Sequence, residues 1–377
     1  MNNYDVIVVG AGPAGSTAAR ICAEKGLNVL IIEKEDFPRE KPCGGGLSMG
    51  AVKELDIILP ESLIVEKCYG MRSVFNGRQS QIFDSQPVAY MINRIEFDDF
   101  LLKKAIESGA VFQKKRCLNV VEKNDGVIIK TDIDEIFAGY CIGADGYFSK
   151  TARAVRDKFS EDEIRFCLIT SIIGNNHHPI YDREKPSVEL DFGYISLGYG
   201  WLFPKHTHIS AGIGGALKDR KNLRNQFISF LKFHNLTPSN QLTGCFIPIS
   251  RLKQPICTDR IMLTGDAAGL VDSFSGEGIK NAIISGKTAA ETAYEVLNSN
   301  KKVTAALYRK KIYSQIAQDL IWSMRISKLS NRYENIVYGK LLFSEKIIKK
   351  YFTVMRGEKN YKRFFIETII SLPFLFS

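Results

Sequence analysis

The sequence lacks several features that would place it in a specialised class of protein. Its eight cysteines are scattered, with no CxxC pair and no signal peptide, so we expect reduced thiols, a cytoplasmic protein and no metal cluster. No apolar run approaches the ~20 residues that a membrane-spanning helix requires. The N-terminus enters a predicted strand almost at once, and we therefore expect no targeting segment. What is left is an ordinary globular composition, with 45% hydrophobic and 24% charged residues.

Acidic residues are in the minority, because 41 aspartates and glutamates face 51 lysines and arginines and leave a formal net charge of +10. A charge of this size is compatible with nucleic acid, an anionic membrane or an acidic substrate. No recognised nucleic-acid-binding motif accompanies it, so we expect no nucleic-acid partner. The length of 377 residues allows two or three structural units with substantial cores.

The first 33 residues contain a glycine-rich turn between two apolar runs. Residues 6–9 and 29–32 are typical of buried parallel strands, and residues 16–25 between them are compatible with a helix. Gly10, Gly12 and Gly15 have GxGxxG spacing. In such a unit the first glycine permits a tight turn, the second lets the backbone approach a pyrophosphate, and the third lets helix and strand pack closely.

Glu33 follows the second predicted strand, eighteen residues after Gly15. A carboxylate at this distance accepts hydrogen bonds from an adenosine ribose, while the N-terminus of the helix faces the phosphates. With two strands and an acidic residue around it, the GxGxxG motif predicts a dinucleotide site. The alternative is a glycine-rich turn without a ligand.

A second glycine-rich loop reads KPCGGGLS over residues 41–48. Proline and three consecutive glycines exclude a regular element, so the backbone of this loop must pass close to another group. Cys43 has two interpretations that we weigh evenly: a small buried hydrophobic residue, or a thiol beside the cofactor.

Three further segments predict a return to the same sheet. Arg94 lies just before a predicted helix that ends near residues 108–109, and its guanidinium either reaches a phosphate or flavin edge or is solvated. Residues 111–131 predict two strands joined by an Asn-Asp-Gly turn. Buried strands then end at GADG (143–146), with a helix expected after it, and at GDAAG (265–269), where GEG (276–278) opens a helix over residues 279–298.

Residues 164–249 change to short alternating segments, which predicts an antiparallel sheet. Tyr199, Trp201 and Phe203 alternate and therefore share one face of a strand, either as an aromatic core stripe or as the wall of an apolar substrate cavity. His206 and His208 also share a face. We expect no metal there, because such sites need three or four convergent ligands.

The last eighty residues are helical in pattern, basic, and end in an apolar tail over residues 364–376. The tail is too short to span a bilayer. It either lies in a membrane interface, with the preceding cations facing anionic lipid, or docks into the protein itself or a second copy.

The GxGxxG, GADG and GDAAG motifs, in this order, resemble those of the flavoprotein hydroxylase superfamily, which binds FAD. Within it, KPCGGGLS at 41–48, YGWLFP at 199–204 and GIG at 212–214 resemble the geranylgeranyl reductase family. The resemblance implies FAD-dependent saturation of isoprenoid double bonds, on archaeal-type diether lipids or related polyprenyl compounds. It also implies that Arg94 and Asp266 contact FAD, that Cys43 lies near the isoalloxazine, and that the aromatic residues of YGWLFP line a lipid tunnel.

The chain departs from the superfamily pattern at residues 271–276, VDSFSG, where a proline beside the flavin is frequent. This departure disfavours a hydroxylase. Two other functions stay open: an FAD monooxygenase or halogenase, because the Trp201 segment loosely resembles the WxWxIP motif of flavin halogenases, and a non-catalytic flavoprotein that carries isoprenoid lipid or relays electrons. The electron donor is NAD(P)H or a ferredoxin, since no second GxGxxG marks a nucleotide domain.

We therefore expect an α/β fold with three parts, in the cytoplasm or at a membrane surface. A Rossmann-like FAD-binding domain takes residues 1–70, 91–160 and 250–298, an antiparallel β-sheet substrate domain takes 71–90 and 161–249, and a helical region takes 299–377. The predicted catalytic residues are Cys43, Tyr199 and Trp201. The predicted substrate contacts are Tyr199, Trp201, Phe203, Pro204, Gly212 and Gly214. The predicted cofactor contacts are Gly10, Gly12, Ala14, Gly15, Glu33, Lys34, Cys43, Gly44, Gly45, Arg94, Asp145, Gly146, Gly265, Asp266, Gly276, Gly278 and Ile279.

Overall fold

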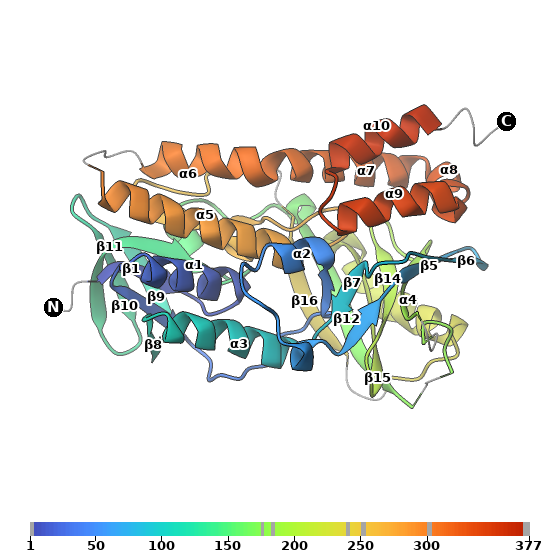
Figure 1. The fold of residues 1–377 in the computed structure, drawn as a ribbon, viewed down its shortest axis with the longest axis horizontal. Helices are drawn as coiled ribbons and strands as arrows, with labels where there is room; N and C mark the ends of the chain where they lie inside the picture. The colour runs from blue at the N-terminus through green and yellow to red at the C-terminus, as the bar shows by residue number, and fades with distance from the viewer. Residues whose placement is uncertain are drawn as a thin grey trace.

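The computed structural model describes residues 4–174, 177–181, 185–238, 242–249, 254–299 and 304–371. Two large sheets lie beside each other, with a layer of helices along one side (Figure 1). This mixed α/β arrangement, with one sheet mainly parallel around the glycine-rich turn and one mainly antiparallel, confirms the predicted fold class.

The first sheet contains the two predicted strands around the glycine-rich turn. Its order is β8-β2-β1-β11-β10-β9, with β17 paired to β11, and the pairs β8–β2, β2–β1, β1–β11 and β11–β17 are parallel. The bounds are β1 Tyr4–Val9, β2 Val29–Glu33, β8 Val111–Lys114, β9 Cys117–Glu122, β10 Val127–Thr131, β11 Glu135–Gly143 and β17 Ile261–Leu263. The segment 111–131 thus holds three strands and not the predicted two, because the chain leaves the sheet edge at 115–116 without glycine or proline and returns as the β9–β10 hairpin.

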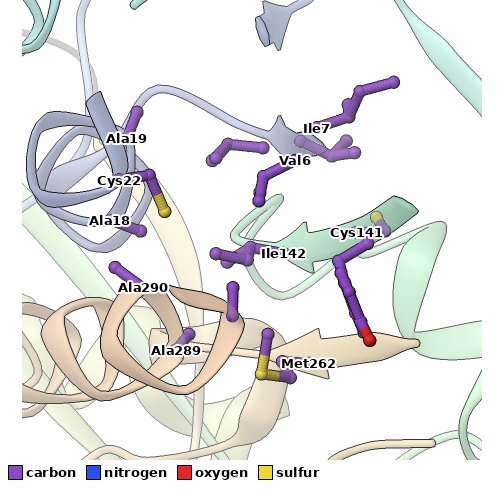
Figure 2. Close-up of a cluster of buried hydrophobic side chains, with 14 of the residues drawn as sticks. Val6, Ile7, Ala18, Ala19, Cys22, Cys141, Ile142, Met262, Ala289 and Ala290 are labelled. Atoms are coloured by element: carbon purple, nitrogen blue, oxygen red, sulfur yellow. The ribbon is translucent and has the colours of Figure 1, made fainter. Parts of the chain in front are cut away.

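Three helices pack against this sheet: α1 Pro13–Glu24, α3 Arg94–Glu107 and α5 Ile279–Leu297. Figure 2 shows side chains of the sheet, such as Val6, Ile142 and Met262, facing Ala18 and Ala289 from α1 and α5. Small residues let the two helices approach closely, and a Cβ at Gly286 would lie 2.3 Å from the carbonyl oxygen of Ala14.

The second sheet has the order β16-β12-β15-β14-β13-β5-β6 and is antiparallel except for the parallel β13–β5 pair. Helix α4, Arg220–Phe233, packs on one face. The bounds are β5 Gly70–Phe75, β6 Arg78–Phe83, β12 Ile164–Ile173, β13 Ser187–Phe192, β14 Tyr199–Pro204, β15 His208–Ala216 and β16 Thr243–Pro248. A small sheet of β3 Gly46–Ser48, β7 Ala89–Met91 and β4 Glu66–Cys68 lies between the two, beside helix α2, Met49–Lys53.

The C-terminal residues are helical, as predicted. A π-helical segment, Tyr313–Ala317, joins α6 to α7, and together they form a long run above α5 that continues toward the second sheet (Figure 1). The bounds are α6 Thr304–Ile312, α7 Gln318–Arg332, α8 Glu334–Val337, α9 Glu345–Met355 and α10 Tyr361–Ser371. Within the described ranges, no helix is both long and apolar enough to cross a membrane.

Two local predictions need correction or restriction. The segment after GADG forms a 3₁₀ turn, Thr151–Ala154, in place of the expected helix. In the apolar tail, Phe364 and Thr368 of α10 are buried, so this part docks on the protein, whereas residues 372–377 lie outside the described residues.

The contact between α1 and α5 generates a test. Replacing Gly286 by alanine raises the helix propensity by about 1 kcal/mol, but overpacking a closed contact costs about 1–3 kcal/mol. The carbonyl of Ala14 belongs to the backbone and moves little, so we expect the Gly286→Ala variant to unfold at a lower temperature than the wild type. Glu291→Ala, in the same helix but partly exposed, is the control and should leave the thermal midpoint nearly unchanged. Equal midpoints for both variants would contradict the close contact.

Candidate active site

One cavity of about 1610 Å³ runs between the two sheets and the C-terminal helices. It begins at the glycine-rich turn, passes the loop at 42–46 and the face of β14, and reaches α7, α9 and α10. The predicted site residues that line it are Gly10, Gly12, Ala14, Glu33, Lys34, Cys43, Gly44, Gly45, Arg94, Asp145, Gly146, Tyr199, Trp201, Phe203, Gly214, Gly265, Asp266, Gly276, Gly278 and Ile279.

The glycine-rich turn brings the N-terminus of α1 to one end of the cavity. Gly10 has a φ of +100°, and a Cβ there would lie 2.4 Å from the carbonyl oxygen of Ala144. Gly15 does not line the cavity but packs on the turn itself, since its Cβ would lie 1.9 Å from the carbonyl oxygen of Gly10. Gly12 faces the cavity, where its missing side chain leaves space beside Arg39.

Glu33 is nearly buried and ties the end of β2 to the turn. Its Oε2 accepts the amide of Ala11 at 3.0 Å, and its Oε1 accepts the amides of Lys34 at 2.8 Å and Glu35 at 3.2 Å. The carboxylate is therefore held in place at the cavity wall. Contact with a ribose stays a prediction.

The two predicted aspartates differ in what their carboxylates contact. Asp145 accepts hydrogen bonds from the hydroxyls of Ser149 and Thr151, both at 2.5 Å, and from the amide of Lys150 at 2.7 Å. It therefore stabilises the 3₁₀ turn. The carboxylate of Asp266 has no hydrogen bond from the described residues and is open to a ligand in the cavity.

A buried carboxylate holds two arginines at the cavity. Asp98 is fully buried and accepts two hydrogen bonds from Arg94, both 2.8 Å long. It also forms an ion pair with Arg39 at 3.3 Å. Arg94 also contacts Cys43. Both guanidiniums line the cavity near Gly12 and the loop at 42–46, so this end carries positive charge suited to phosphate groups.

The glycines of the loop at 42–46 let its backbone lie on aromatic rings. A Cβ at Gly44 would lie 2.8 Å from Nε1 of Trp201, and one at Gly46 would lie 3.0 Å from the ring of Phe203. The amide of Gly45 donates to the sulfur of Cys43 at 3.3 Å. The glycine run thus has a steric cause, and it brings the Cys43 thiol to the cavity.

The aromatic residues of β14 form the cavity wall beyond this loop. The ring centroids of Tyr199 and Trp201 are 6.2 Å apart, and those of Trp201 and Phe203 are 6.3 Å apart. Gly212 and Pro204 do not line the cavity among the described residues. Gly212 makes room for the indole, because a Cβ there would lie 2.1 Å from Cζ2 of Trp201.

Lys205 supports the loop of the site and was missed by the sequence interpretation, although it does not itself line the cavity. It is 3% exposed, and its Nζ donates to the carbonyl oxygens of Ile92 at 2.6 Å and Gly45 at 3.4 Å. Burial lowers the pKa of Lys205 to about 8. The ammonium thus fixes the loop that carries Cys43. The only sequence signal was a lysine directly after a buried strand.

That Glu277 and the C-terminal helices line the cavity was also not predicted. Glu277 faces the cavity and pairs with the hydroxyl of Ser48, and burial raises its pKa. Its position between two glycines was the available signal. The far wall is apolar and comes from residues whose sequence pattern indicated only helix: Leu329, Ile336, Leu342, Ile348 and Met355.

Comparison with known proteins gives three results. Residues 3–172 match the family model described as FAD binding domain. A digeranylgeranylglycerophospholipid reductase of Thermoplasma acidophilum is 34% identical over 324 residues, which cover 80% of this chain and 80% of that protein. The crystal structure of a geranylgeranyl bacteriochlorophyll reductase-like protein from the same organism has a TM-score of 0.80 and 26% identity, covering 97% of this chain and 98% of that one.

A halogenase in complex with FAD is similar at the level of the fold alone. It has a TM-score of 0.68 at 17% identity, covering 88% of this chain and 76% of that chain.

The space beside Gly12 generates the first test of the site. Gly12 has ordinary backbone angles, with φ −75°, so a Gly12→Val variant should fold. Its side chain would occupy the space in which a phosphate approaches the backbone, at a cost of about 1–3 kcal/mol, or roughly a tenfold to hundredfold weaker affinity for FAD. Fluorescence titration of the apoprotein with FAD measures this, and unchanged affinity would contradict the assignment of Gly12.

The buried lysine generates the second test. Between about pH 8 and about pH 10 the folded state binds fewer protons at Lys205 than the unfolded state, whose lysine pKa is ~10.4. The free energy of unfolding therefore rises with pH over this window. We expect it to rise more in the wild type than in Lys205→Met, which has no titrating group, when urea unfolding is measured at several pH values. The exposed Lys218→Met is the control, and a pH-independent difference for Lys205→Met would contradict the lowered pKa.

Proposed function

Because the chain belongs to the family of FAD-binding proteins that includes the digeranylgeranylglycerophospholipid reductases, we propose that it is an FAD-dependent reductase that saturates C=C bonds of geranylgeranyl or related polyprenyl chains. The observation that carries the proposal is the continuous cavity from the glycine-rich turn to the apolar C-terminal helices. Its volume exceeds the ~300–1,000 Å³ of a site for one drug-sized ligand. It therefore suits a dinucleotide together with a second, long apolar ligand.

The residues at the charged end fit FAD. The space beside Gly12 at the start of α1 and the guanidiniums of Arg39 and Arg94 suit its pyrophosphate. The open carboxylate of Asp266 suits a polyol hydroxyl, and the start of α5 at Ile279 suits an anionic ring edge. When bound, FAD in its reduced form supplies a hydride, which the protein itself does not hold.

The apolar end fits an isoprenoid chain. Tyr199, Trp201 and Phe203 form one wall, and leucine, isoleucine and methionine side chains of α7 and α9 form the other. An isolated alkene accepts a hydride only when a proton reaches the second carbon. In a trisubstituted prenyl alkene the positive charge develops on the more substituted carbon, where the faces of Tyr199 and Trp201 stabilise it.

Two groups on the wall are the proton donors that we propose. One is the thiol of Cys43, fixed by Gly45 and Arg94. The other is the carboxyl of Glu277, whose pKa is raised by burial. A water molecule at the flavin is the third source. A proton from one of these and the hydride together add two hydrogens across the double bond.

We propose that NAD(P)H or a ferredoxin is the electron donor and that the protein acts at a membrane surface. Helix α10 buries Phe364 but exposes Ile366, Ile369 and Ile370 by 44%, 48% and 63%. Arg363 on the same helix is exposed as well. Apolar side chains beside a cation suit the interface of an anionic bilayer, from which a prenyl lipid reaches the cavity.

The experiment is anaerobic incubation of dithionite-reduced protein with digeranylgeranyl lipid in vesicles, followed by mass spectrometry. We expect reoxidation of the flavin and a mass gain of two hydrogens per reduced bond. Trp201→Leu removes a stabilisation of about 1–2 kcal/mol and should slow reoxidation roughly tenfold. Trp322→Leu is the matched control, because Trp322 does not line the cavity and packs on Phe365.

The same assay separates the alternatives. Oxygen-dependent hydroxylation or halogenation of the lipid would favour the monooxygenase or halogenase interpretation. Binding of lipid without flavin reoxidation would favour a carrier. Cys43→Ser and Glu277→Gln distinguish the two proposed side-chain proton donors. Only the variant that lacks the donor is expected to lose the pH dependence of flavin reoxidation.

A further inference from the structure

Two histidines and a glutamate meet on the face of the second sheet that lies away from the cavity. Along β13, Val188, Leu190 and Phe192 line the cavity, so the alternate residues Glu189 and Asp191 point to the opposite face. There they meet His234, directly after α4, and His178, in the segment before β13. The side chains of Asp191 and Glu189 are buried, with 1% and 0% exposure.

The ligand atoms of the three residues lie close together. One ligand atom from each of His178, Glu189 and His234 lies within 4.8 Å of the other two. Nδ1 of His234 is 3.2 Å from Oε1 of Glu189, close to the separation of two ligand atoms around one zinc ion with bonds of about 2.0–2.1 Å. The other nitrogen of His234, Nε2, is 3.0 Å from Oδ2 of Asp191.

The protein groups present leave the Glu189 carboxylate incompletely satisfied. Arg72 lies 2.7 Å from Oε2 and His234 lies 3.2 Å from Oε1, yet neither contact has hydrogen-bond geometry. Both carboxylate oxygens of Glu189 are therefore buried without a hydrogen bond from the described residues, and leaving buried polar atoms unsatisfied is costly.

The ring of His178 lies beside that of His234, with the two ring centroids 5.9 Å apart. Its present contact, from the amide of Ile180 to Nδ1 at 3.4 Å, is at the outer limit of a hydrogen bond. A metal–nitrogen bond would replace it at small cost.

We propose that His178, Glu189 and His234 bind a divalent transition metal ion of the zinc class. Two imidazoles and one carboxylate are a ligand set for Zn²⁺, whereas Mg²⁺ and Ca²⁺ take oxygen ligands. The carboxylate of Asp191, 3.0 Å from Nε2 of His234, orients that ring, as carboxylates do behind metal-bound histidines. The ion would join the end of α4 and the segment 177–181 to β13, whose other face is the cavity wall. Its role is therefore structural, and it does not depend on the proposed reductase function.

No metal was expected from the sequence, where only His206 and His208 were weighed. His206 is 70% exposed and lies 3.7 Å from Glu66. It provides the matched control, because it is a histidine next to a carboxylate that has no third metal-ligating group beside it among the described residues.

The test is the zinc content of the full-length flavoprotein, purified without a histidine tag and passed through metal-free buffer, by plasma mass spectrometry. We expect about one zinc per chain. His178→Gln and His234→Gln should lower the affinity at least tenfold, and His206→Gln should not change it. If a variant fails to fold, titration of the chelator-treated wild type with Zn²⁺ gives an independent measure: the thermal midpoint should rise with Zn²⁺ and not with Mg²⁺.

Cobalt substitution gives a signature that a merely structural ion-pair network lacks. Co²⁺ in a site with two histidines and a carboxylate absorbs at wavelengths beyond the flavin bands, and the absorption should saturate at one equivalent. A wild type that contains no zinc and shows no shift of its midpoint with added Zn²⁺ would overturn the proposal and leave an ion-pair network. Zinc retained equally by all three variants would also overturn it.

Discussion

The close approach of backbone to backbone around the glycine-rich turn is the constraint on which the rest of the molecule depends. Gly10 lies against Ala144, Gly15 against Gly10, and Gly286 of α5 against Ala14 of α1. At each contact a side chain would meet main-chain atoms that have little freedom to move. These contacts seat α1 beside α5 against the sheet, and its N-terminus consequently opens on the cavity.

Side chains alternate along β13 and β14, so one face of the second sheet forms the cavity wall and the other carries a buried polar cluster. On β14, three aromatic residues face the cavity, and the glycines at 44, 46 and 212 remove the side chains that would collide with their rings. On β13, apolar residues face the same cavity, while Glu189 and Asp191 face α4. The wall of the cavity and the buried polar cluster are thus opposite surfaces of one sheet, and a disturbance of either is transmitted through a single layer of backbone.

The sequence predicted what is decided by local pattern. The GxGxxG turn, the helices α1, α3 and α5 and the shared face of Tyr199, Trp201 and Phe203 follow from glycine spacing and periodicity, and they were recognisable. Residues whose role depends on tertiary contacts were not. A lysine such as Lys205 is usually exposed, and only the loop packed over it shows that it is buried. Asp145 lines the cavity, but that its carboxylate accepts hydrogen bonds from Ser149 and Thr151 depends on the turn that follows and could not be predicted from the sequence. His178 and His234 are 56 positions apart in the chain, so no motif connects them.

The single chamber shared by the cofactor end and the apolar end has a consequence for the order of events. Under the proposed function, a long prenyl chain would lie lengthwise in this chamber, and only one of its double bonds would be adjacent to the flavin at a time. Successive bonds would then reach that point by sliding of the chain and not by rebinding in a new orientation. The depth of the chamber would then determine which double bond is reduced first and which double bonds are left unreduced.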